Sequence, residues 1–180
     1  MSARGRPPQR GWTADHRQRV DEILDEYRNA LHDSLQGLTE DEARRRLVPS
    51  KTTLLGLLKH ATFVEGVWFD QAVTGRSYAE IGIPSTVDGS FTLHEGDTIA
   101  TVQTAFRARC DASRRALADL ESHVIVHGRG ARPVWALQLQ GLRELAQHAG
   151  HADILREQIL ASRSVATRVN VEPVDIEDRS

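Results

Sequence analysis

Apolar residues recur every three to four positions along most of the chain, which is the period of an amphipathic helix. The first such stretch predicts a helix over about residues 14–36, and Gly37 is placed to end it. Thr39 and Glu42 then have the spacing of a capping box, which predicts a short helix before Pro49 stops it.

Three more long helices are predicted by the same pattern. The second spans about residues 52–73, with Gly75 as its C-cap. The third spans about residues 98–121, with Asp97 as its N-cap. The fourth runs from Pro133, near its first position, to about residue 161. Four long amphipathic helices predict an all-α four-helix bundle with one long connection between helices 2 and 3.

That connection, residues 75–97, is rich in Gly and shows no sustained helical period. A connection of this length is either functional or disordered, and it is the best candidate for a substrate lid. Four apolar residues within it indicate that it packs onto the bundle: Ile81, Ile83, Phe91 and Leu93. The chain as a whole divides into a flexible basic arm (1–12), the bundle (13–162) and a flexible acidic tail (163–180).

Composition excludes several classes of protein. The 180 residues carry 23 Lys and Arg against 25 Asp and Glu, a net charge of −2, so no basic footprint for nucleic acid is present. No apolar run approaches the ~20 residues that span a bilayer, and no secretory signal is recognisable, so a cytoplasmic location is expected. The one cysteine, Cys110, lies on an apolar helical stripe and is predicted to be a core residue, not a nucleophile.

Polar residues interrupt the apolar stripe of two helices. On the fourth helix, Glu144, His148 and His151 share one face. On the second, His60 lies on the apolar stripe. Imidazole and carboxylate ligands from two helices of a bundle suit zinc, nickel or iron, and three ligands leave positions open for catalysis. The alternative is that these are hydrogen-bonded core residues with no metal.

Three segments resemble the DinB-like superfamily. They are TLLGLLKHATFVEGVWF (53–69), FTLHEGDTIATVQTAFRARCDASRRAL (91–117) and VWALQLQGLRELAQHAGHADILRE (134–157). The resemblance covers about residues 14–161 and is nearest to the actinobacterial branch with mycothiol-dependent maleylpyruvate isomerase and mycothiol S-transferases. It implies a metal held by His60, Glu144 and His148, with His151 as an alternate or near-site residue.

The resemblance also implies a chemistry. A divalent metal, zinc first and Ni²⁺ or Fe²⁺ as alternatives, would activate a low-molecular-weight thiol such as mycothiol, which then attacks an electrophilic small molecule. Thiol-dependent isomerisation would share the first step. Trp68, Arg129 and Arg132 are candidate pocket residues, because an aromatic wall and arginines can hold a substrate. The branch allows a homodimer, and its members often have His at the place of Gln140.

Other functions remain open at this stage. Two histidines and a carboxylate also suit a non-haem iron enzyme that uses oxygen. A metal-dependent hydrolase is a further alternative. The bundle could instead be a non-catalytic protein that binds a metal or small ligand and acts through a partner.

Overall fold

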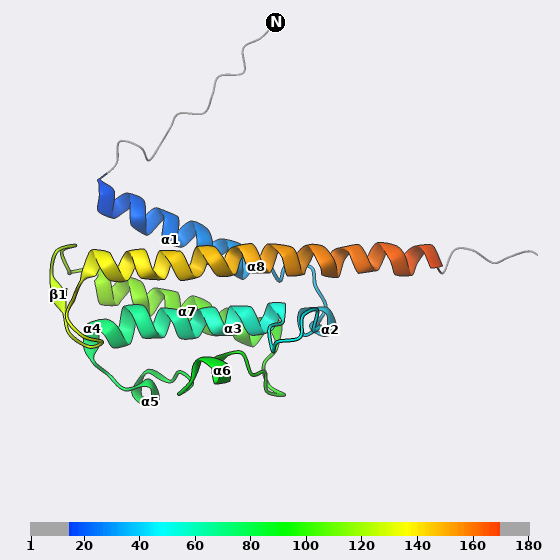
Figure 1. Ribbon diagram of the computed structural model, residues 1–180, viewed down its shortest axis with the longest axis horizontal. Coiled ribbons are helices and arrows are strands. Elements are labelled where there is room, and N and C mark those ends of the chain that lie inside the picture. Colours follow the sequence, from blue (N-terminus) through cyan, green and yellow to red (C-terminus); the bar gives the residue numbers. More distant parts are fainter. Residues whose placement is uncertain (1–14, 170–180) are drawn as a thin grey trace, which may run out of the picture.

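The computed structural model describes the backbone of residues 15–169 and the side chains of residues 15–163. Four long helices form the body of the molecule (Figure 1). They are α1 (His16–Asp33), α3 (Leu54–Glu65), α7 (Ile99–Leu117) and α8 (Val134–Val169). The prediction of an all-α four-helix bundle is therefore confirmed.

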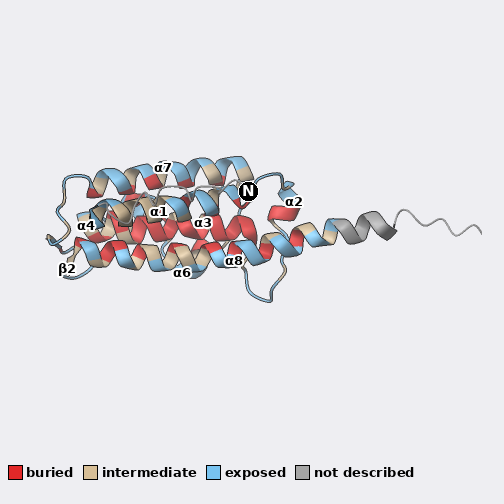
Figure 2. Cartoon of the chain, turned by 90° about the horizontal axis from the view of Figure 1, so that it is seen from above, coloured by how far each residue is buried: buried red, intermediate tan, exposed pale blue. Residues whose placement is uncertain are grey.

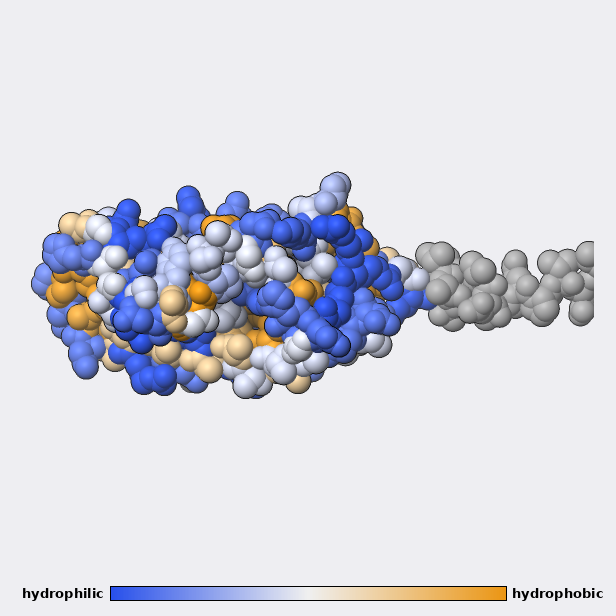
Figure 3. Space-filling model, turned by 90° about the horizontal axis from the view of Figure 1, so that it is seen from below, coloured by the Kyte–Doolittle hydropathy of each residue, from blue (hydrophilic) through white to orange (hydrophobic). Residues whose placement is uncertain are grey.

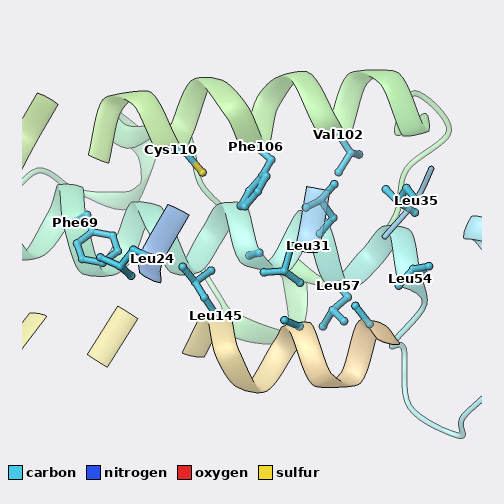
Figure 4. Close-up of a cluster of buried hydrophobic side chains, with 14 of the residues drawn as sticks. Leu24, Leu31, Leu35, Leu54, Leu57, Phe69, Val102, Phe106, Cys110 and Leu145 are labelled. Carbon is cyan, nitrogen blue, oxygen red and sulfur yellow. The ribbon is translucent and has the colours of Figure 1, made fainter. Parts of the chain in front are cut away.

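The apolar stripes of the helices meet in one core. Helix α1 packs on α8, and α3 packs on both α7 and α8. Buried residues follow the inward side of each helix, while the outward side is exposed (Figure 2). Figure 4 shows side chains from these helices converging, Cys110 among them. Cys110 is 4% exposed, which confirms it as a core residue.

Helix α3 does not end at Glu65 but widens. It continues as the π-helical segment η1 (Gly66–Gln71) and then α4 (Ala72–Thr74), and Gly75 ends it with a φ of 75°. A π-helical turn inside an α-helix is frequent at functional sites. Opposite it, Gly141 of α8 lies so close to Phe69 that a Cβ there would be 2.7 Å from the ring atom Cε2. This contact sets how closely the two helices approach.

The long connection has more structure than its sequence predicts. It contains α5 (Tyr78–Ile81) and α6 (Val87–Ser90), each opened by a side-chain cap, and such short helices are too brief to show a period. The four apolar residues in it all pack against the bundle, as expected. Figure 3 views the face that carries this connection and shows orange hydrophobic residues exposed among hydrophilic ones.

The starts of α7 and α8 differ from the prediction. Thr98, not Asp97, caps α7, because the Asp97 carboxylate accepts hydrogen bonds from Lys59 and from the backbone of His94. Pro133 precedes α8 and belongs to strand β2 (Arg132–Pro133), which pairs with β1 (Ile125–Val126). Strands of two residues leave no alternation in the sequence to detect.

Helix α8 extends to Val169, beyond the predicted end near residue 161. The predicted basic arm (1–12) and residues 170–180 of the predicted tail lie outside the described residues. The short helix α2 (Glu40–Ala43) carries the predicted capping box between Thr39 and Glu42. No described helix is long and apolar enough to cross a membrane.

Candidate metal centre

Two histidines from different helices meet inside the bundle. His60 of α3 and His148 of α8 have ring centroids 4.7 Å apart, with the rings nearly perpendicular at 87°. The helices are antiparallel here, because His60 lies beside His148 while the later Phe69 lies beside the earlier Gly141. Of the polar residues that the sequence singled out on these two helices, His60 and His148 are thus brought into contact.

The tautomer of His60 follows from its hydrogen bond. Its Nδ1 lies 2.7 Å from Oγ of Ser90, and that hydroxyl donates its own proton to the backbone carbonyl of Val87 at 2.5 Å. The hydroxyl oxygen must therefore accept from Nδ1–H. In the neutral ring this leaves a lone pair on Nε2, the form that binds a metal.

The surroundings of His60 favour that neutral form. The ring stacks on Phe91 with centroids 4.0 Å apart and is 5% exposed. Burial, with a smaller contribution from His148, lowers the pKa of His60 to about 4. At neutral pH His60 is thus uncharged and available as a ligand.

The two ring nitrogens of His148 are buried and unpaired within residues 15–163. Both Nδ1 and Nε2 are buried without a hydrogen-bond partner among the described residues. Burial lowers the pKa of His148, and the Glu144 carboxylate, 3.7 Å from Nε2, opposes this only in part. Unpaired buried polar groups are rare in native proteins and call for an explanation such as an ion.

Glu144 lies at the edge of the histidine pair. Its Oε2 faces His148, while its Oε1 accepts hydrogen bonds from Gln140 at 2.8 Å and from Arg143 at 2.9 Å. The side chain is 21% exposed, so the site reaches the surface here. Among residues 15–163, the structure contains no group of three His, Cys, Asp or Glu side chains close enough together to hold a metal ion.

Several other candidates lie farther out. His151 is exposed, and its ring centroid is 5.9 Å from that of His148. Trp68, Arg129 and Arg132 do come together, since both guanidinium groups lie over the Trp68 ring at 5.2 and 5.9 Å.

The chain also has a cleft of about 1070 Å³ between α1, the end of α7 and the start of α8. None of His60, Glu144 and His148 lines it. Several of its polar groups already bond to one another: Gln138 donates to Asp21 at 2.7 Å, and Arg114 to Asp25 at 2.8 Å. The histidine pair and this cleft are therefore separate places on the molecule.

Residues 19–161 match the model of a family described as mycothiol S-transferase. The chain belongs to the mycothiol S-transferase family. This match confirms the resemblance drawn from the sequence, and its range includes both histidines and Glu144. No curated protein sequence matches the chain.

The residues that hold the two histidines in place could not be recognised in the sequence. Ser90 bonds to His60 across 30 positions, and no spacing in the sequence connects the two. Phe91 was expected only to pack on the bundle, but it stacks directly on His60. For Gln140, the i, i+4 spacing to Glu144 was a signal that could have identified the hydrogen bond.

Proposed function

We propose that this protein is a metal-dependent transferase that joins a mycothiol-like thiol to an electrophilic small molecule. We assign His60, Glu144 and His148 as the ligands of a divalent cation, with zinc as the preferred ion. The observation that carries the proposal is that both ring nitrogens of His148 are buried without a hydrogen-bond partner among the described residues. Family membership supports the thiol.

The donor set fits such an ion. Two neutral imidazoles and one carboxylate are good zinc ligands, and they leave room for a substrate. Burying these groups with no ion to satisfy them would cost free energy. A cation held here would lower the pKa of a thiol brought to it, so that the thiolate forms near neutral pH.

The remaining residues orient and shield the ligands. Ser90 keeps the proton of His60 on Nδ1, so that Nε2 stays free. Gln140 and Arg143 occupy Oε1 of Glu144 and leave Oε2 on the side of His148. Phe63 and Phe91 stack against His60 and exclude water from its faces.

The chain does not offer its own thiol for this reaction. Burial raises the pKa of Cys110 far above that of a free cysteine, and a thiolate is the reactive form. Cys110 also lies in the core beside α1 rather than at the histidine pair. The nucleophile in this proposal is therefore the cosubstrate.

Elemental analysis of the purified protein tests the metal first. We expect about one zinc ion per chain, lost in His60→Ala and His148→Ala. The matched control is His151→Ala, which removes an exposed histidine of the same helix and should keep the metal. Iron in place of zinc, with turnover only in oxygen, would replace the transferase with an oxygen-using enzyme.

Activity is tested with mycothiol and N-ethylmaleimide, whose adduct is counted by mass spectrometry. We expect conjugation above the uncatalysed rate in the wild type and its loss in His148→Ala. A zinc-loaded protein that conjugates neither N-ethylmaleimide nor other maleimides would contradict the transferase assignment. Metal content unchanged in His148→Ala would remove that residue as a ligand.

A further inference from the structure

A second cluster of side chains lies farther along the helix that carries His60. We call Trp68, Arg129 and Arg132 the Trp68 shelf. Trp68 belongs to the π-helical segment η1, Arg129 comes from the loop between β1 and β2, and Arg132 is the first residue of β2. Both guanidinium groups lie within cation–π range of the same ring, at 5.2 and 5.9 Å from its centroid.

The shelf is held rigidly. Arg129 donates to the side-chain oxygen of Gln71 at 3.2 Å and to the Tyr78 hydroxyl at 3.0 Å, and Arg132 donates to the backbone carbonyl of Arg129. The loop itself lies directly on α4, because Gly128 donates to the Ala72 carbonyl at 3.0 Å. A side chain at Gly128 would come within 2.6 Å of the Gly75 nitrogen, so only glycine permits this approach.

The charge of the shelf is not balanced. In the part of the chain that the structure describes, neither Arg129 nor Arg132 pairs with a carboxylate, whereas the neighbouring Arg76 and Arg109 both bind Asp70. A guanidinium has five N–H donors, and the contacts above use few of them. Two positive charges over one ring, with unused N–H donors, favour the binding of an anion. Among anions, a carboxylate can accept two hydrogen bonds from one guanidinium group.

Aromatic contacts join the shelf to the candidate metal centre. The Phe63 ring lies 5.9 Å from His60 on one side and 5.7 Å from Tyr78 on the other, and the Tyr78 hydroxyl bonds to Arg129. Trp68 follows His60 by eight residues, which is roughly 12 Å of helix rise at about 1.5 Å per residue. A small molecule can span that distance.

We propose that the Trp68 shelf binds a carboxylate on the electrophilic substrate, whose reacting carbon lies roughly 12 Å away at the histidine pair. The reaction of the bound substrate depends on the proposed transferase function, whereas binding of its carboxylate at the shelf does not. It names the substrate class as a carboxylate with an apolar spacer to its electrophilic carbon. Trp68 would cover the apolar part near the carboxylate.

Two electrophiles of equal reactivity provide the test: 6-maleimidohexanoic acid and its methyl ester. In the wild type we expect a higher kcat/KM for the acid. The double variant Arg129→Gln/Arg132→Gln should lower the kcat/KM of the acid by roughly 10- to 100-fold, the worth of one or two charged hydrogen bonds. The kcat/KM of the ester should fall much less than that of the acid, and the remaining turnover of the ester shows that the variant is folded and active.

The matched control is Arg46→Gln/Arg115→Gln, which removes the same charge at two exposed positions outside the shelf. It should leave the preference for the acid unchanged. An acid preference that survives in the shelf variant, or that falls equally in the control, would overturn the proposal.

Calorimetry with the unreactive analogue 6-succinimidohexanoic acid tests carboxylate binding at the shelf independently of the transferase activity. If no maleimide is conjugated, the transferase fails, yet the acid should still bind the wild type more tightly than its methyl ester. That difference should vanish in the shelf variant and persist in Arg46→Gln/Arg115→Gln. Equal binding of acid and ester by the wild type would refute the shelf whatever the activity.

Discussion

Replacing Arg28 with Met is expected to destabilise the protein by about 3–5 kcal/mol, because it leaves a buried carboxylate without its counter-charge. Arg28 of α1 and Glu65 of α3 form a bidentate ion pair through the core, with both N···O distances at 2.9 Å. Glu65 is 0% exposed and Arg28 is 5% exposed. Water therefore cannot replace the lost guanidinium.

The expected destabilisation by Arg28→Met is large compared with the total free energy of unfolding. A domain of this kind unfolds at about 5–15 kcal/mol, so the single change removes a substantial share. Replacing both partners, in Arg28→Met/Glu65→Leu, deletes the two charges together and is expected to be near neutral or stabilising by about 1–4 kcal/mol. Asp25, which also accepts from Arg28, keeps its second partner Arg114 in either variant.

Urea unfolding followed by circular dichroism measures both variants. The reasoning requires the double variant to be more stable than Arg28→Met. A double variant at least as destabilised as the single one would show that the packing of the arginine stem and its contact with the Phe69 ring, 5.5 Å from the guanidinium, dominate instead. A single variant that loses less than about 1 kcal/mol would show that solvent reaches Glu65.

Four further outcomes are expected. Gly141→Ala should destabilise by about 1–3 kcal/mol in urea unfolding, because its methyl group would overlap the Phe69 ring. Cys110 should react with Ellman's reagent only on unfolding, since burial raises its pKa; rapid labelling of the native protein would contradict this. The free energy of unfolding of the metal-free protein should decrease as the pH falls from 6.5 toward about 4, by up to about 1.4 kcal/mol per pH unit. The reason is that the unfolded chain protonates His60 more readily than the folded chain does. In His60→Phe this dependence on pH should be weaker. Ser90→Ala should weaken zinc binding by about 10- to 100-fold in a chelator competition, and Ser90→Thr should restore part of it.

The helices and the convergence of His60 with His148 could be predicted from the sequence. Both follow from local periodicity, since residues on one stripe face the same core. Glu144 was placed beside His148 by the same helical spacing, the resemblance of three segments to a known family then implied the ligand set, and the family match confirms the resemblance itself. The ligand set remains a proposal.

What could not be predicted depends on contacts between distant segments. Ser90 reaches His60 from a helix of four residues, too short for periodicity to reveal. The cap of α7 was assigned to Asp97, but that carboxylate has a stronger competing partner in Lys59, at 2.6 Å. The shelf depends on a π-helical turn, and a hydrophobic pattern does not distinguish that turn from an ordinary α-helix.

The bond between Ser90 and His60 has a consequence for how this protein can change in evolution. Residues 87–91 supply the hydroxyl, the carbonyl that orients it and the ring that stacks on the imidazole. Residues 87–91 must therefore be inherited as one unit with the histidine that they support, together with Thr86, whose side chain caps the helix that carries Ser90.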